Sequence, residues 1–172
     1  MKHKIRSGKK QAARRRTKFG ELDRTDKEIL RALQADGRMS NVALAERVHL
    51  SPAACLERVR ALVEGGYIRG FRAMLEPIML DAGMLVFVQV VLERTTPDVF
   101  DAFKAAVQSR PEILECHMIA GGFDYLLKAR VQDMHAYREF TATAVWALPG
   151  VRETHTYVVM EEVKETSELP VR

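Results

Sequence analysis

The sequence is poor in cysteine: only Cys55 and Cys116 occur among 172 residues, far apart and outside any Cys-x-x-Cys pair. The simplest interpretation is that both thiols are small apolar side chains buried in a core. A disulfide or a reactive thiolate is the alternative. Cysteine chemistry is therefore not where we expect the function to lie.

Long apolar stretches are also missing. No run approaches the roughly 18 residues that span a bilayer, and the basic N-terminal stretch is not followed by the apolar segment of a secretory signal. Residues of apolar type nevertheless make up 47% of the chain, which is enough for a buried core. We expect a cytoplasmic protein without a membrane partner.

Motifs for catalysis are absent as well. The sequence contains no P-loop, no Gly-x-Gly-x-x-Gly and no Ser-His-Asp order, and Gly121-Gly122 is too weak a signal for a nucleotide loop. Four of the five histidines are spread without the His-x-x-x-His spacing of a metal site: His49, His117, His135 and His155. We therefore expect no enzyme activity, no metal and no cofactor.

Charge, by contrast, is present and unevenly distributed. Residues 1–20 contain no acidic residue and nine basic ones, whereas the remainder contains 18 basic and 23 acidic residues. The basic residues of this segment are Lys2, Lys4, Arg6, Lys9, Lys10, Arg14, Arg15, Arg16 and Lys18. Such blocks remain unfolded by self-repulsion and often bind nucleic acid. A solvated tail that only aids solubility is the alternative.

Residues 21–75 have the pattern of a helix-turn-helix. Asp23 is a predicted helix start and Gly37 a stop, and Ser40 is the predicted cap of a second short helix. Ser51-Pro52 is a strong start for a third helix, which ends at Gly65-Gly66. Three short helices with a tight turn between the last two are typical of this motif. Residues 67–75 are expected to form a small β-wing, and residues 76–84 a linker.

The second half of the chain alternates strands and helices. We expect strands over 85–92, 113–119, 125–131 and 154–163, and helices over 97–109 and 134–148. The order β-α-β-β-α-β is ferredoxin-like, with helices on one sheet face only, so the fold class is α+β. Because the first and last strands are apolar on both sides, a second copy of the sheet is the simplest cover for the open face. The pattern therefore predicts a homodimer.

The third helix is the candidate DNA-reading helix, because such helices place their N-terminal residues at base edges in the major groove. Helical periodicity predicts apolar core faces for the second and third helices: Val42, Leu44, Ala45 and Val48, then Leu56, Val59, Leu62 and Val63. The predicted DNA-contacting residues are Ser51, Ala53, Ala54, Glu57, Arg58 and Arg60. Arg58 suits a guanine edge or a phosphate, and Ser51 with the free first-turn amides suits a phosphate. An ordinary surface helix is the alternative.

Several separated motifs resemble the leucine-responsive regulatory protein (Lrp/AsnC) family of transcriptional regulators. In the first half they are Leu22-Asp23-Arg24-Thr25-Asp26, Asp36-Gly37-Arg38-Met39-Ser40-Asn41, Leu50-Ser51-Pro52 and Cys55-Leu56-Glu57-Arg58-Val59-Arg60. In the second half they are Glu115-Cys116-His117, Gly121-Gly122-Phe123-Asp124-Tyr125-Leu126-Leu127-Lys128 and the run from Thr156 to Lys164. The resemblance covers about residues 21–166, in the same order as in the family.

The resemblance implies a winged helix-turn-helix joined to a ferredoxin-like (RAM) domain over 85–166, with 167–172 as a C-terminal tail. It implies homodimers that assemble into octamers, bind and wrap double-stranded DNA in the nucleoid, and regulate amino-acid metabolism genes. It also implies a small amino-acid effector, leucine in close relatives. The effector-binding residues that it indicates are Gly121, Gly122, Asp124, Met134, Tyr157, Val158 and Val159.

The chemistry of these residues fits a zwitterion with an aliphatic side chain. Asp124 is a partner for the ammonium group, and a Gly-Gly loop presents amides to the carboxylate. Met134 and Val159 are an apolar wall. For Asp124 alone, a turn residue that bonds its own backbone is the alternative.

The chain departs from close relatives in the family at several positions. Ala53-Ala54 replaces Thr-Pro at the start of the reading helix, so the target sequence is open. Gly122 replaces an acidic residue, and Trp146 replaces an aliphatic residue in a region linked to assembly. Two other functions remain open: an architectural DNA-wrapping protein without an effector, and a sensor of another amino acid such as methionine, lysine or alanine.

Overall fold

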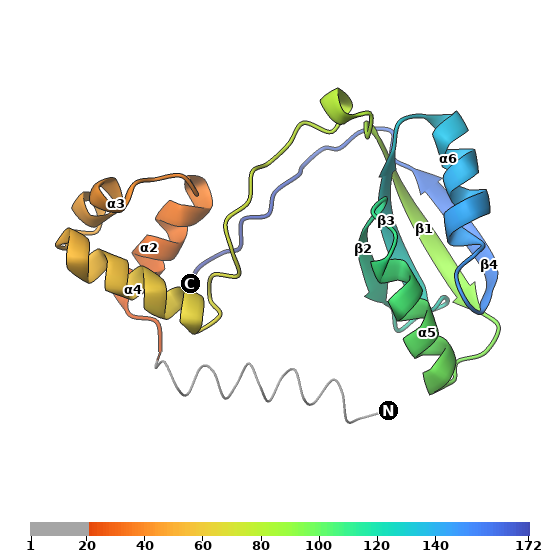
Figure 1. The fold of residues 1–172 in the computed structure, drawn as a ribbon, viewed down its shortest axis with the longest axis horizontal. Helices are drawn as coiled ribbons and strands as arrows, with labels where there is room; N and C mark the ends of the chain where they lie inside the picture. Colours follow the sequence, from red (N-terminus) through yellow and green to blue (C-terminus); the bar gives the residue numbers. More distant parts are fainter. Residues whose placement is uncertain (1–20) are drawn as a thin grey trace. The chain divides into compact units, whose positions relative to one another are not determined.

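The computed structural model describes residues 21–172, and the basic segment 1–20, with its predicted DNA contact, lies outside the described residues. The described chain forms two compact units (Figure 1). The helical unit contains residues up to Met74 together with Glu165–Arg172, and the sheet unit contains Leu75–Lys164. The chain therefore passes between the two units twice.

Within residues 21–74, the helical unit contains three helices: α2 (Arg24–Ala35), α3 (Asn41–Arg47) and α4 (Pro52–Glu64). Each begins directly after the polar residue predicted as its cap. The side chains of Asp23, Ser40 and Ser51 each accept a hydrogen bond from the amide three residues further on. These bonds satisfy amides that have no partner within the helix, which is why short polar residues begin helices so reliably.

The end of α4 is also determined by residues close to it in sequence. Gly66 has a φ of 77°, and its amide donates to Val63 while the amide of Tyr67 donates to Leu62. This is the Schellman pattern, which glycine favours because it has no Cβ to resist a positive φ. Beyond it, the β-wing expected over 67–75 is not formed, since these residues include no strand.

The core of the helical unit consists of seven buried residues: Ile29, Ala32, Leu44, Ala45, Val48, Cys55 and Leu62. Three residues predicted to lie on core faces are exposed instead: Val42 is 55% exposed, Val63 45% and Leu56 38%. The inward face of α4 is centred on Cys55 and Leu62, because three packed short helices bury a narrower stripe than the apolar residues of α4 would fill.

The sheet unit begins with a short 3₁₀ turn, η1 (Ile78–Leu80), and then follows the predicted order. Its elements are β1 (Met84–Leu92), α5 (Pro97–Gln108), β2 (Ile113–Met118), β3 (Tyr125–Val131), α6 (Met134–Phe140) and β4 (Val151–Val158). The strands pair antiparallel in the order β2-β3-β1-β4. Figure 1 shows α5 and α6 on the same side of this sheet, which confirms the ferredoxin-like arrangement.

Two expected boundaries in this unit are wrong. The last strand runs over 151–158, not 154–163, because Val86 pairs with Val158 and the start of β1 leaves no partner for residues after Val159. The helix expected over 134–148 changes at Thr141 into a π-helix, η2 (Thr141–Val145). There the Trp146 amide donates to the carbonyl of Thr141, five residues back.

The strand register assigns each residue to one sheet face. Val86, Val88 and Val90 of β1 lie with Tyr125, Leu127 and Ala129 of β3 in the core under α5 and α6. The alternate residues of these two strands face the other way: Phe87, Gln89, Val91, Leu126, Lys128 and Arg130. We call this second surface the open face, because neither α5 nor α6 covers it.

Candidate functional site

The start of α4 is an exposed surface of the helical unit. Ser51, Ala53 and Ala54 are all exposed, and none of them contributes to the core. Glu57 and Arg60 are also exposed and form an ion pair of 2.7 Å on the helix surface. The predicted DNA-contacting residues thus share one accessible region of one helix, with small side chains at its start where a base edge approaches closest.

The turn before α4 holds this helix in place against α3. The side chain of Asn41 donates to the carbonyl of Pro52 over 2.8 Å, and the amide of Leu50 donates to Ala45. Between them His49 adopts a φ of 56°, which turns the chain sharply. The first turn of α4 is therefore fixed relative to the rest of the helical unit.

Arg58 differs from the other predicted DNA contacts because its ion pairs connect α4 with the start of another helix. Its Nη1 donates to Asp23 over 2.6 Å and to Asp26 over 2.8 Å, and its side chain is 37% exposed. The hydrogen bond from the Asp26 amide, followed by the guanidinium of Arg58, lowers the pKa of Asp23 below its usual range. Arg58 therefore joins α4 to the N-terminus of α2. Apart from the residue types, no sequence pattern indicates this pairing.

In the sheet unit, Gly121, Gly122 and Asp124 lie in and directly after the loop that joins β2 to β3. Both glycines are exposed. One carboxylate oxygen of Asp124 accepts the amide of Leu92 over 2.8 Å, so part of this side chain holds the end of β1. The other oxygen has no hydrogen-bond partner among residues 21–172, and the backbone at the two glycines is exposed.

The remaining predicted effector residues lie at the opposite end of the sheet. Tyr157 pairs with Phe87 and Val158 with Val86, whereas Asp124 lies beside Val90 and Leu92. Met134 begins α6 just after β3 ends, at the same end as Val158 and Val159. At about 3.3 Å per residue, the two groups are roughly 15–20 Å apart along β1. A single chain does not bring all seven residues together.

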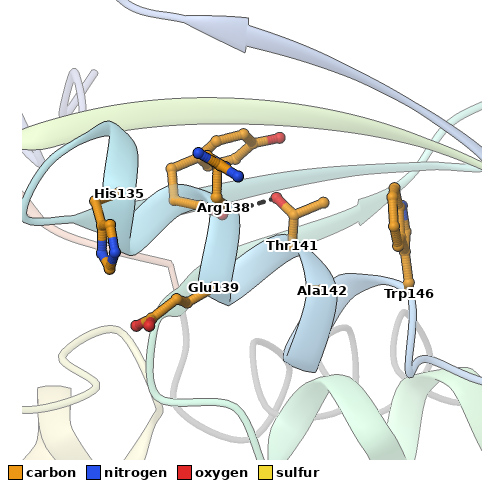
Figure 2. A pocket seen from close by; sticks show the side chains of 7 residues that line it. His135, Arg138, Glu139, Thr141, Ala142 and Trp146 are labelled. Atoms are coloured by element: carbon orange, nitrogen blue, oxygen red, sulfur yellow. Dashed lines mark hydrogen bonds between the residues drawn. The ribbon is translucent and has the colours of Figure 1, made fainter.

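A surface hollow of about 520 Å³ lies along α6 and η2 (Figure 2), and the sequence did not indicate it. It is lined by His135, Tyr137, Arg138, Glu139, Thr141, Ala142 and Trp146. Trp146, which is 67% exposed, forms one wall, and none of the predicted effector residues belongs to it. Only a helical wheel of residues 135–146 would have suggested such a surface.

Two searches of residues 21–172 gave negative results. No group of three or more His, Cys, Asp or Glu side chains in this range is placed to hold a metal ion. No helix within the same range is long and apolar enough to cross a membrane.

Comparison with known proteins assigns a class to each unit. Residues 22–69 match the family model described as winged helix-turn-helix DNA-binding, and residues 85–169 match the Lrp/AsnC ligand-binding domain. The fold and the two matches define a ligand-responsive DNA-binding transcriptional regulator. The match over 22–69 covers α2, α3 and α4 and only the first residues of the segment where no strand forms.

Individual relatives agree with this assignment. The chain is 56% identical over 152 residues to the leucine-responsive regulatory protein of Salmonella typhimurium, covering 88% of this chain and 93% of that protein. The Escherichia coli K12 protein of the same name is 55% identical over the same shares. A transcriptional regulator from Neisseria meningitidis, solved as a complex with L-Met, has a TM-score of 0.82 at 39% identity, covering 87% of this chain and 97% of that one.

The chain therefore belongs to the Lrp/AsnC family of transcriptional regulators. Members of this family combine a DNA-binding and a ligand-binding domain and are not enzymes, in agreement with the prediction from the sequence.

Proposed function

We propose that this regulator binds operator DNA through the start of α4 and that an amino acid, leucine first among the candidates, changes its DNA binding. The observation that carries the proposal is the exposed, capped first turn of α4, which is rigidly joined to α3 by the Asn41 hydrogen bond. The relatives named for their leucine response make leucine the first ligand to test. The Neisseria structure with L-Met makes methionine the second.

At the DNA, the predicted contacts divide by chemistry. Ser51 and the first-turn amides bind a phosphate, whereas Ala53 and Ala54 lie against base edges, where a thymine methyl group is a suitable neighbour. Glu57 accepts a hydrogen bond from a cytosine amino group, and Arg60 binds a backbone phosphate. Arg58 reaches DNA only by exchanging its bonds to the two aspartates for a phosphate or a guanine.

At the effector site, the ligand joins two groups of residues that one chain holds apart. Gly121, Gly122 and Asp124 bind the carboxylate and the ammonium group, and Met134 and Val159, with Tyr157 and Val158, enclose the side chain. Because the groups lie at opposite ends of the sheet, the loop of one copy completes its site with the other end of a neighbouring copy. Effector binding is then inseparable from assembly.

The open face supports the homodimer. Phe87, Val91 and Leu126 lie on it and are only partly buried in the single chain. A second copy packed on these residues removes apolar surface from water, which is the main source of stability in permanent interfaces. Octamers formed from these dimers bring further copies together, and wrapping of DNA by such an assembly places the protein in the nucleoid.

A DNA-binding titration tests the function. The DNA is the region upstream of the protein's own gene, at fixed ionic strength, without and with millimolar leucine and then methionine, lysine and alanine. We expect one amino acid to shift the affinity or the cooperativity. Tight binding that no amino acid changes would contradict the effector response and favour the architectural function.

Mixed oligomers test the shared site. Asp124→Ala and Met134→Ala each remove one of the two groups, so oligomers of either variant alone should not respond to the effector. In oligomers that contain both variants, some sites combine an intact loop with an intact opposite end. We expect a partial response from the mixture; its absence would mean that each chain uses its own residues only.

The architectural function is the second candidate, and the nine basic residues of segment 1–20 favour it. Phosphate binding by such residues is independent of sequence and weakens with salt, with a slope of about −0.9 per phosphate contact. Removal of residues 1–18 should lower DNA affinity and flatten this slope. An unchanged slope would show that the segment does not bind phosphate.

A further inference from the structure

The C-terminal segment Glu165–Arg172 belongs to the helical unit, although it follows directly on the sheet unit in sequence. The side chain of Gln34 on α2 donates to the carbonyl of Leu169 over 3.0 Å and accepts the amide of the same residue over 2.7 Å. One turn earlier on α2, Arg31 donates to the carbonyl of Val171 over 2.8 Å. Figure 1 shows the C-terminus beside the helices of this unit.

This contact is a specific way to hold an extended segment. An amide side chain carries one donor and one acceptor side, so Gln34 pairs with a residue's backbone much as a neighbouring strand does. Arg31 and Gln34 lie three residues apart and therefore share a face of α2. Val171 is half-buried there while the residues around it are exposed.

We propose that residues 165–172 form a strap, docked on α2 by Gln34 and Arg31, that transmits the effector response from the sheet unit to the DNA-binding helices. The strap begins seven residues after β4 ends, and β4 carries Tyr157 and Val158 of the proposed effector site. Arg58 in turn joins α2 to the DNA-reading helix. A ligand that shifts the end of β4 thereby acts on α2 and, through Arg58, on α4.

Gln34 and Arg31 are positioning residues in this scheme, since neither belongs to the proposed DNA or effector contacts. The inference rests on the proposed amino-acid response, and its test separates the two. The full-length variant Gln34→Met keeps the length and helix propensity of the side chain but loses both bonds to Leu169. Gln108→Met, at the exposed end of α5 in the sheet unit, is the matched control.

Two measurements are made on each variant. Hydrogen exchange with mass spectrometry follows peptides that cover 165–172, and fluorescence anisotropy follows binding to operator DNA without and with leucine or methionine. In Gln34→Met we expect roughly tenfold faster exchange of the strap, the size expected for the loss of two hydrogen bonds. We also expect effector-free DNA affinity within about twofold of wild type and a reduced effector-induced shift. Gln108→Met should match wild type in all three.

Each of the other outcomes contradicts one specific part of the proposal. Unchanged exchange of 165–172 in Gln34→Met would overturn the docking of the strap. Faster exchange with a full effector-induced shift would overturn its role in transmission. A wild-type protein that responds to no amino acid would remove the proposed function, and transmission with it, while the exchange data still decide whether the strap docks through Gln34.

Discussion

In the helical unit, the candidate DNA contacts come from one helix and fall within ten consecutive residues, 51–60. In the sheet unit, the candidate effector residues come from a loop, the start of α6 and the end of β4, and they lie at two ends of the sheet. The first group of residues lies together within a single chain, whereas one chain holds the second group apart. Under the proposed function, ligand binding is therefore linked to assembly, while each copy carries its own DNA-reading helix.

The same contrast appears in how the two units are stabilised. The helical unit depends on caps and short turns around a core whose buried residues are aliphatic apart from Cys55. The sheet unit depends on a larger core in which aromatic side chains stack, with Phe103 and Tyr125 at 4.4 Å between ring centroids. Truncation of a core side chain should therefore lower the free energy of unfolding most in the sheet unit. Removal of a helix cap should destabilise only its own helix in the helical unit.

The largest expected effect is that of Phe103→Ala. Phe103 is fully buried, so its truncation should destabilise the sheet unit by about 3–5 kcal/mol. Trp146 is the only tryptophan and lies in the sheet unit, so urea unfolding followed by its fluorescence reports this unit alone. Phe71→Ala, at an exposed phenylalanine, is the control. An equal loss of stability for Phe71→Ala in this titration would contradict the distinction between two separate cores.

A smaller effect with the opposite sign is expected for Tyr125→Phe. The hydroxyl of Tyr125 is buried and has no hydrogen-bond partner among residues 21–172, and burial raises the pKa of this group to about 12. Removing an unsatisfied hydroxyl should stabilise the sheet unit by about 1 kcal/mol in the same urea titration. Tyr137→Phe is the matched control, because it loses the bond to Thr156 and should destabilise. Loss of stability in Tyr125→Phe would show that its hydroxyl is satisfied by water.

These contrasts explain which parts of the structure the sequence could predict. Helix starts at Asp23, Ser40 and Ser51 were predicted to the residue, because a cap depends on a side chain and an amide three positions away. The end of β4 was not predicted, because it depends on the residue at which β1 begins, some seventy residues earlier. Pairings over such separations are decided by the whole sheet and leave no local mark.

The candidate sites divide in the same way. The DNA-reading helix was located from its caps and its periodicity, but the pairing of Arg58 with two aspartates depends on how α2 packs on α4. The effector residues were indicated by resemblance alone, and their separation along β1 followed only from the strand register. The docking of residues 165–172 on Gln34 had no sequence signal, because backbone recognition places no demand on residue type.

A comparison of two caps in the helical unit separates folding from DNA contact. Ser40 and Ser51 accept an amide hydrogen bond of the same length, 3.2 Å, so Ser40→Ala and Ser51→Ala should each destabilise their helix by about 1 kcal/mol. Only Ser51 is a proposed phosphate contact. DNA affinity should therefore fall further for Ser51→Ala, with the difference read by anisotropy at fixed salt. Equal losses for the two variants would remove Ser51 from the interface.

The smallest expected effect is a pH dependence of the helical unit. The amide of Asp26, and then Arg58, lower the pKa of Asp23 in the folded state, so the folded protein holds the ionised carboxylate more strongly than the unfolded chain does. The resulting stabilisation is fully present above the unfolded pKa of about 3.9 and is lost as the pH falls through the lower folded value. Because Asp23 is half exposed, the contribution is modest.

Asp23→Asn tests this dependence while it preserves the cap, since asparagine caps helices as well as aspartate does. Thermal melts of the helical unit between pH 5 and about pH 3 should show a shallower loss of stability in this variant than in wild type. Asp133→Asn changes the corresponding cap of α6 and should leave the slope of the helical unit unaltered. An unchanged slope in Asp23→Asn would mean that the acid sensitivity of the helical unit comes from other carboxylates. The link between α2 and the DNA-reading helix would then depend on Asp26 and Arg58 without a measurable contribution from the charge of Asp23.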